Sequence, residues 1–295
     1  MALLVSGEPR LGLLMRADRL EVWGDPIDHS LSPVLHSAAY RRLGFDWSYG
    51  RRRVDEDSFA GELAGLGPEF RGLSCTMPLK AAAYRAATWR DTRAEASGAV
   101  NTLLLQPTTA GGGLRGYNTD VGGIVRALAD EGVTEVADAR IVGAGATATS
   151  ALVAVAELGA RDVEIVARRP AAAAPLEQLG ERLGIAVRAV PLDARPHAAR
   201  DVTVATLPGS AQLPDEVSAA LAAGGGPLLD VVYGHGPTAL TQAWSRAGLP
   251  WTDGLGMLLH QAALQIRIFA TGDVDAPLTA EDDVVDVMRR ALMGD

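Results

Sequence analysis

The chain has 295 residues, which is long enough for two domains, and its hydrophobic content of 48% suffices for a sizeable core in each. The formal net charge of −9 at pH 7 excludes nucleic acid as a main partner and disfavours an anionic membrane surface, because phosphate binding requires a positive surface. No apolar run approaches the length of a membrane span, and the single cysteine, Cys75, excludes a disulfide within the chain and indicates a reducing, cytoplasmic compartment.

The N-terminal residues 1–20 are a poor match to a signal peptide. Their apolar stretches are short, and Glu8, Arg10 and Arg16 interrupt them. We therefore interpret this segment as a loose extension and expect translation to begin at Met15.

Strand-like and helix-like segments alternate from residue 20 onward, which predicts an α/β fold with mainly parallel sheets. Ser32 and Pro33 mark the start of the first helix, with Ser32 as its N-cap. The elements predicted in the first part of the chain are a strand at 20–24, a helix at 33–42, a short strand at 47–49, a helix at about 58–66, a strand at 71–76, a helix beginning at Pro78, and a hairpin of 100–105 and 114–117.

The pattern changes near Asn118, where helices and strands begin to alternate regularly. The series contains a βαβ unit, the building block of a Rossmann-type, doubly wound parallel sheet. The elements predicted here are a helix at about 120–131, a strand at 140–142, a helix at 147–158, strands at 163–167, 187–190, 202–205 and 228–232, and helices at 256–270 and about 280–292.

A glycine-rich turn, Gly143-Ala144-Gly145-Ala146-Thr147-Ala148, lies directly after a predicted strand and before a predicted helix. Glycine allows the tight turn and a close approach of the backbone to a pyrophosphate, which then accepts hydrogen bonds from the free N–H groups of the helix N-terminus. The alternative is an ordinary tight turn between a strand and a helix. The strand–turn–helix–strand context favours nucleotide binding.

Arg168 and Arg169 follow the next predicted strand, at the position where an NAD site usually carries an acidic residue for the ribose 2′-hydroxyl. Two guanidinium groups and no carboxylate suit a 2′-phosphate, so the sequence favours NADP. The alternative is a pair of solvated arginines before a loop.

Four short polar segments stand out in the part of the chain before residue 121. Taken singly, each has an ordinary explanation: a helix cap, a solvated lysine, a turn, or a carboxylate that complements a helix dipole. Their polar side chains are Ser30 and Ser32 in DHSLSP, Thr76 and Lys80 in TMPLK, Asn101 in AVNT and Asp120 in NTD.

In combination, these segments resemble shikimate dehydrogenases, and the resemblance runs from Leu20 nearly to the C-terminus. It implies an N-terminal α/β substrate domain beside a Rossmann-type domain. It also implies reversible NADPH-dependent reduction of 3-dehydroshikimate to shikimate, in chorismate and aromatic amino acid biosynthesis. The matching segments are 30–33, 76–80, 98–102, 118–120, 143–145 and 253–262.

The resemblance also implies roles for individual residues. Lys80 and Asp120 would form the catalytic pair, in which the lysine exchanges a proton with the reacting oxygen and the carboxylate orients the lysine. An equally weighted alternative for Tyr233 is a partly buried aromatic side chain at a strand end. Ser30 and Ser32 would contact the substrate carboxylate, and Thr76, Asn101 and Gln261 would contact its ring hydroxyls, with Tyr233 near the substrate. The residues that would contact NADP are Gly143, Ala144, Gly145, Ala146, Thr147, Arg168, Arg169, Thr206 and Gly254.

The chain departs from the family pattern at two places that bear on the site. Ser74-Cys75 stands where the family often has Asn-Val, and Ala167 stands where NADP-type members often have Asn. Two alternatives therefore stay open: an NAD-dependent quinate/shikimate dehydrogenase, and a nucleotide-binding regulatory relative without turnover. Intact Lys80 and Asp120 argue against the second.

We predict a discontinuous substrate domain of residues 1–119 and 254–295, an NADP-binding domain of residues 120–253, and a cleft between them. The expected partner is a small-molecule substrate, with a homodimer left open. No metal is expected, because the histidines show no ligand spacing, and His260 is interpreted as a packing or surface residue.

Overall fold

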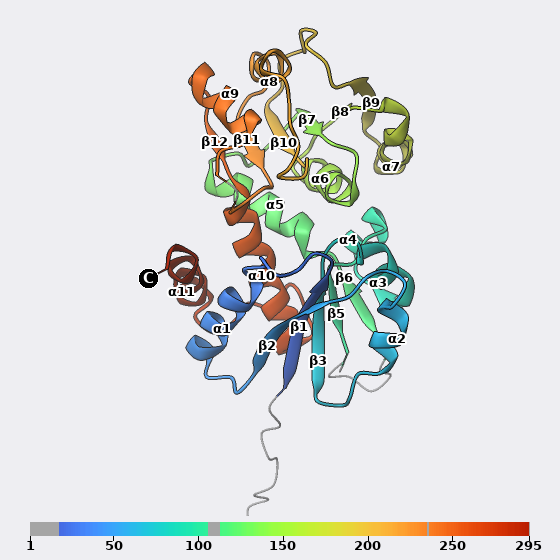
Figure 1. The fold of residues 1–295 in the computed structure, drawn as a ribbon, viewed down its shortest axis with the longest axis vertical. Coiled ribbons are helices and arrows are strands. Elements are labelled where there is room, and N and C mark those ends of the chain that lie inside the picture. Colours follow the sequence, from blue (N-terminus) through green and yellow to red (C-terminus); the bar gives the residue numbers. More distant parts are fainter. Residues whose placement is uncertain (1–17, 106–112, 235, 295) are drawn as a thin grey trace, which may run out of the picture.

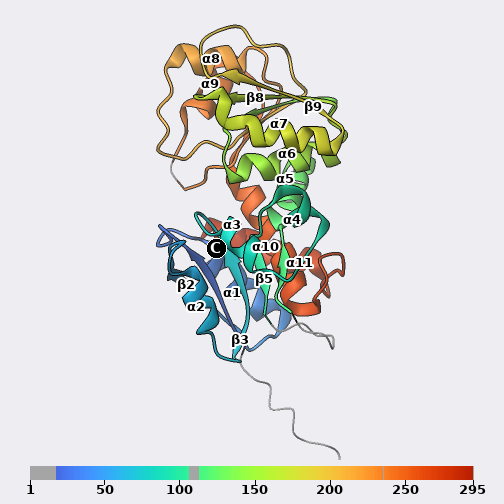
Figure 2. The ribbon, with the colours of Figure 1, turned by 90° about the vertical axis from the view of Figure 1, so that its right-hand side faces the viewer.

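The computed structural model describes residues 18–105, 113–234 and 236–294. Two six-stranded sheets are stacked along the long axis of the molecule, and helices α5 (Thr119–Asp130) and α10 (Gly254–Thr271) pack side by side between them (Figures 1 and 2). The predicted start at Met15 and most of the turn of the predicted hairpin, 106–112, lie outside the described residues. None of the helices in the described ranges is long and apolar enough to cross a membrane.

The first sheet has the strand order β2-β1-β3-β5-β6-β4 and is mainly parallel as predicted, since three of its five strand pairings are parallel and two are antiparallel. Strand β5 runs antiparallel to both β3 and β6, which confirms the predicted hairpin. This hairpin makes the sheet mixed, because a short connection joins antiparallel neighbours. The strands are β1 (Arg19–Gly24), β2 (Ser48–Arg53), β3 (Phe70–Cys75), β5 (Thr102–Leu104), β6 (Arg115–Tyr117) and β4 (Trp89–Arg90), of which β4 was not predicted.

Two helix layers cover the two faces of this sheet, and alternate strand residues point to one layer or the other. Leu20 and Val22 of β1 pack with the layer that includes α10, whereas Trp23 of β1 and Leu73 of β3 pack with the opposite layer. The first layer contains α1 (Ser32–Leu43), α10 and α11 (Glu281–Met293), and the second contains α2 (Phe59–Ala64) and α3 (Lys80–Ala86). Helix α4 (Thr92–Ser97), which was not predicted, lies near α6 (Ala146–Glu157), a helix of the second half.

The prediction that Ser32 caps the first helix is wrong. The helix already begins at Ser32, and Leu31 occupies the N-cap with helical dihedral angles and no side-chain hydrogen bond. Because Ser32 lies inside the first turn, its hydroxyl is not needed for capping; its backbone N–H instead points to Ser30 Oγ, 3.3 Å away. Similarly, α3 begins at Lys80 and not at Pro78, because a turn over 77–79 precedes it.

The second sheet is entirely parallel and has the order β12-β11-β10-β7-β8-β9. The direction of winding reverses between β7 and β10, as in a doubly wound Rossmann-type sheet, where ligands bind outside the carboxyl ends of the strands. The strands are β7 (Asp138–Val142), β8 (Asp162–Ala167), β9 (Ala186–Pro191), β10 (Val202–Ala205), β11 (Leu228–Asp230) and β12 (Trp251–Thr252).

Helices flank the second sheet on both faces. One core lies among the buried side chains of α5, α6 (Ala146–Glu157) and α7 (Ala174–Leu183), and the other lies among those of α8 (Asp215–Ala222) and α9 (Ala239–Ala247). Helix α6 is predicted by the sequence, whereas α8, α9 and β12 are not, because they are short segments whose burial depends on the sheet they pack against.

Glycines allow α5 and α10 to approach each other closely. A Cβ atom on Gly123 would lie 2.9 Å from both Gln261 Cβ and the Met257 carbonyl oxygen, and a Cβ on Gly122 would lie 2.6 Å from Leu264 Cδ1. The chain passes from the first sheet to the second through α5 and returns through α10, so this close pair of helices joins the two halves (Figure 1).

Candidate active site

Lys80 and Asp120, predicted as a pair although 40 residues apart, are in direct contact. The Lys80 Nζ atom lies 2.5 Å from Asp120 Oδ2. Their side chains are only 13% and 8% exposed, so solvent screens the ion pair weakly. Lys80 is the first residue of α3, directly after the turn that follows β3, and Asp120 lies in the first turn of α5.

Asp120 is held by hydrogen bonds to both its backbone and its side chain. Asn118 caps α5, and its Oδ1 accepts from the Asp120 backbone N–H at 3.1 Å. The Asn118 amide donates in turn to the hydroxyls of Ser97 and Ser150, at 2.7 and 3.0 Å. Asn118 lies in one of the segments that match the family, but no role is predicted for it from the sequence. Its position directly before a predicted helix is the signal that would have identified it as an N-cap.

Asn101 is buried and contacts Asp120 directly. Its Nδ2 donates to Asp120 Oδ1 at 2.8 Å and to Thr119 Oγ1 at 2.9 Å, and its Oδ1 accepts from the Thr119 backbone N–H at 2.9 Å. Both ends of the amide are therefore engaged with the protein. The predicted contact of Asn101 with a substrate hydroxyl stays a prediction, whereas its contact with the carboxylate is a feature of this structure.

Three of the predicted substrate-binding residues offer hydroxyl groups. Ser32 is buried, and Ser30 and Thr76 are half-buried. The hydroxyls of Ser32 and Thr76 make no hydrogen bond with any other residue that the structure describes. The Thr76 methyl group lies against Gly24, where a Cβ would approach to 2.4 Å, so this packing requires glycine at position 24.

Gln261 and Tyr233 come from the other end of the chain. Gln261 is buried on α10 beside Gly123, and its Nε2 donates to the Leu258 carbonyl at 2.9 Å, which leaves its Oε1 without a partner among the described residues. Tyr233 follows β11 and is half-buried. Burial raises the pKa of its phenol, and the charge of the Asp120 carboxylate raises it further.

The glycine turn has the geometry that the sequence analysis predicted. Gly143 has a φ of +122°, a conformation that favours glycine, and a Cβ there would lie 2.4 Å from Thr206 Oγ1. Gly145 is the N-cap of α6 and supplies no side chain to the free N–H groups of that helix. A Cβ on Gly145 would meet nothing within 4 Å, so this helix N-terminus is accessible to an anion.

The remaining predicted cofactor residues lie at the same edge of the second sheet. Arg168 and Arg169 directly follow β8, are exposed, and form no ion pair within the described ranges. Thr206 follows β10. Gly254 begins α10 just after β12 and packs so closely on the residue after β11 that a Cβ would lie 2.1 Å from the Val231 carbonyl oxygen. Because parallel strands share one carboxyl edge, these residues and the glycine turn lie along one border.

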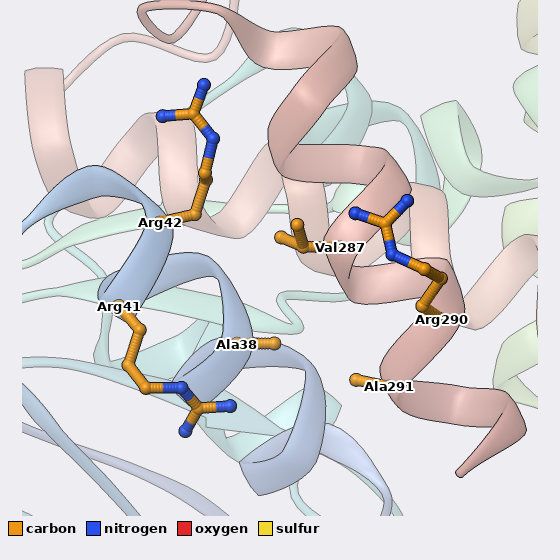
Figure 3. A pocket seen from close by; sticks show the side chains of 6 residues that line it. All are labelled: Ala38, Arg41, Arg42, Val287, Arg290 and Ala291. Carbon is orange, nitrogen blue, oxygen red and sulfur yellow. The ribbon is translucent and has the colours of Figure 1, made fainter. Parts of the chain in front are cut away.

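A separate hollow of about 370 Å³ lies between α1 and α11, and three arginines border it (Figure 3). None of its lining residues is a predicted site residue. One of the arginines, Arg42, is paired with Asp283 at 2.5 Å, and the side chains in Figure 3 point in different directions instead of converging. We therefore do not assign the hollow to the site.

Comparison with known proteins supports the resemblance. The family model for the shikimate dehydrogenase substrate binding domain matches residues 22–103. The chain is 34% identical to the NADP(+) shikimate dehydrogenase of Methanothermobacter thermautotrophicus over 281 residues, which cover 92% of this chain and 94% of that protein.

The chain belongs to the shikimate dehydrogenase family.

Solved structures of this family have the same fold. The shikimate dehydrogenase of Mycobacterium tuberculosis superposes with a TM-score of 0.81 at 40% identity, covering 94% of this chain and 99% of that one. The Thermus thermophilus enzyme, solved in complex with NADP(H) and shikimate, gives a TM-score of 0.74 at 31% identity, covering 93% and 99%. The family thus accounts for both halves of the chain, including the Rossmann-type sheet beyond residue 103.

Proposed function

We propose that this chain catalyses the reversible NADPH-dependent reduction of 3-dehydroshikimate to shikimate, a step of chorismate and aromatic amino acid biosynthesis. The observation that carries the proposal is the weakly solvated Lys80–Asp120 ion pair, 2.5 Å long, with the predicted substrate residue Asn101 bonded to it. Membership of the shikimate dehydrogenase family supports the choice of substrate.

Lys80 is the proton donor in this proposal. Its ammonium group has three N–H donors, of which one is directed at Asp120, so a second can hydrogen-bond to a ketone oxygen. That hydrogen bond polarises the carbonyl, and a proton moves from Nζ to the oxygen as negative charge develops there. Asp120 keeps the ammonium oriented. NADPH, when bound, supplies the hydride; in the reverse direction the Lys80 amine accepts the hydroxyl proton.

The substrate contacts are proposed from the hydrogen-bonding capacity of the side chains. The hydroxyls of Ser30 and Ser32 suit the carboxylate, and Thr76, Gln261 and Tyr233 suit the ring hydroxyls. A ring hydroxyl would reach Asn101 by replacing one of its present partners, such as the Thr119 hydroxyl. The accessible hydroxyl of Thr76 and the unpartnered Oε1 of Gln261 support this assignment.

The cofactor contacts are proposed at the carboxyl edge of the second sheet. The open helix N-terminus at residues 143–147 fits a pyrophosphate, and Thr206 and Gly254 border the same edge. Arg168 and Arg169 are exposed and without ion-pair partners among the described residues, so both guanidinium groups are available to a 2′-phosphate.

The proposed domain bounds separate the substrate contacts from the cofactor contacts. We propose residues 1–119 and 254–295 as the substrate domain and 120–253 as the NADP-binding domain, since β1–β6 form one sheet and β7–β12 the other. A cytoplasmic location is proposed because the lone Cys75 is a buried free thiol, which suits a reducing compartment. A homodimer stays a prediction that light scattering of the purified protein would test.

The test is to mix the purified protein with shikimate and NADP, shikimate and NAD, quinate and NADP, or quinate and NAD, and to follow formation of the reduced nicotinamide. The proposal expects the fastest reduction with shikimate and NADP. A preference for NAD or quinate would assign the chain to the quinate/shikimate alternative. Cofactor binding without turnover on any pair would refute the dehydrogenase activity proposed here and favour the regulatory alternative.

A further inference from the structure

A continuous chain of hydrogen bonds leads from the Asp120 carboxylate into the core of the substrate domain. Asn101 donates to Asp120 Oδ1 at 2.8 Å, and Thr102 Oγ1 donates to Asn101 Oδ1 at 2.8 Å. Gln265 Nε2 donates to Thr102 Oγ1 at 3.0 Å, and Ser74 Oγ donates to Gln265 Oε1 at 2.8 Å. Each of these residues is buried, so water does not compete for the bonds.

Backbone groups determine the direction of the bonds in this chain. Gln265 Nε2 also donates to the Asn101 backbone carbonyl at 3.4 Å, and Asn101 Oδ1 accepts from the Thr119 backbone N–H. Tyr49 donates its hydroxyl proton to Ser74 at 2.6 Å, so the Ser74 proton is free to point at Gln265 Oε1. His36 Nε2 lies 3.2 Å from the same oxygen. Burial lowers the pKa of His36 to about 3, although the hydrogen bond to Gln265 opposes this, so the ring is neutral. Because Gln265 Oε1 can only accept, the ring meets it through Nε2–H.

Two donors on Oε1 lock the orientation of the Gln265 amide. If the amide were rotated by half a turn, its NH2 group would face the Ser74 hydroxyl and His36 Nε2, and its carbonyl would face Thr102. In the locked orientation the NH2 ends of both amides, Gln265 and Asn101, point along the chain toward Asp120. Aligned dipoles of this kind polarise one another and favour negative charge at the terminal acceptor.

We propose that Thr102 and Gln265 are positioning residues of the active site, which orient the Asn101 amide so that it holds the Asp120 carboxylate against Lys80. The inference rests on the proposed dehydrogenase function, because it concerns the same catalytic pair. Neither residue received a role from its sequence: Thr102 is the last residue of a matching segment, and Gln265 lies beyond one. Ser74, which replaces the Asn common in the family, is the donor that fixes Gln265 in this chain.

The test compares three variants. Thr102→Val keeps the side-chain volume but removes the hydroxyl that links Gln265 to Asn101, whereas Thr102→Ser keeps the hydroxyl and removes only a methyl group. The matched control is Thr203→Val, because Thr203 in β10 is also fully buried but donates to the Gly225 carbonyl in the loop between α8 and β11, away from the pair.

For Thr102→Val we expect kcat for shikimate oxidation to fall roughly tenfold, equivalent to about 1.4 kcal/mol of transition-state stabilisation, with KM for shikimate changed less than about twofold. Thr102→Ser should restore kcat to within about twofold of the wild type. Thr203→Val should lower the melting temperature and leave kcat unchanged. A purely structural role of Thr102 predicts instead that kcat survives in both valine variants, and that result would overturn the inference.

A second readout does not depend on turnover. The side-chain amide protons of Asn101, assigned by NMR, should shift and exchange faster with solvent in Thr102→Val than in the wild type, because the amide oxygen loses the Thr102 donor and keeps only those of Thr119. Unchanged signals would refute the positioning role even if the wild-type protein showed no activity. Conversely, an inactive wild type with altered Asn101 signals in the variant would refute the proposed function and leave the positioning of Asp120 supported.

Discussion

The substitution Asp120→Asn tests the catalytic pair most directly, because it preserves the shape of the side chain and removes its charge. In the native structure one carboxylate oxygen accepts from Lys80 and the other accepts from Asn101. An asparagine offers only one acceptor and adds two donors. Whichever way the new amide is turned, its NH2 group must face either the Lys80 ammonium or the Asn101 NH2 group.

The size of the effect follows from the contact that is lost. A hydrogen bond between charged groups contributes about 1.5–3 kcal/mol, and at 13% and 8% exposure solvent cannot easily replace it. Since about 1.4 kcal/mol corresponds to a factor of ten in rate, loss of this orientation alone lowers kcat by roughly 10- to 150-fold. The effect falls on kcat, and KM changes less, because the ammonium must be aligned chiefly when the proton moves.

The assay is the initial rate of NADP reduction by shikimate, measured over a range of shikimate concentrations, together with thermal unfolding. Asp130→Asn is the matched control: Asp130 ends the same helix α5 and contacts His260 at 2.8 Å, at the opposite end from the pair. We expect Asp130→Asn to keep the wild-type kcat. If Asp120→Asn keeps more than about half of the wild-type kcat while remaining folded, the assignment of the pair as catalytic is wrong.

Three further predictions concern cofactor choice, stability and thiol reactivity. Changing Arg168 and Arg169 to Ala should raise the Kd for NADP by ~10-fold or more and leave the Kd for NAD within about twofold, because only NADP carries a 2′-phosphate. Fluorescence titration measures both constants, and equal losses of affinity for the two cofactors would contradict this prediction. Glu164 is buried beside Arg140 at 2.8 Å, and although burial alone would raise its pKa, the Arg140 hydrogen bond and charge lower it overall. Glu164→Gln should therefore lower the unfolding free energy by ~3–5 kcal/mol at pH 7, as measured by urea denaturation. The difference in unfolding free energy between wild type and variant should shrink as the pH falls through the lowered pKa, because the wild-type carboxyl then becomes protonated too. An equal loss at pH 3 would count against the ion pair. Burial raises the pKa of Cys75 to about 12, so the native protein should resist a thiol reagent at pH 8 and react after unfolding; rapid labelling of the native protein would disprove its burial.

Much of the fold was predictable because local signals carry it. The glycine turn at 143–145 occurs between a strand and a helix as predicted, since a φ of +122° and close contact with a neighbouring loop leave only glycine suitable. The period of apolar residues located α5, α6 and α10 to within a few residues. Strand β4 and helices α8 and α9 were missed, because short segments owe their structure to the sheets that they meet.

The sequence by itself determined which residue types are available for chemistry: a lone lysine after a strand, an aspartate at a helix start, and arginines after the second strand of the parallel sheet. Only the tertiary structure decided how they are connected. Thr102 of β5 and Gln265 of α10 are in contact because α10 packs against β5. Asn101 directly precedes β5, so this packing joins segments more than 160 residues apart in the sequence. Directional hydrogen bonds between such distant segments leave no periodic trace in the sequence, because they depend on where the packed sheet and helix place each side chain.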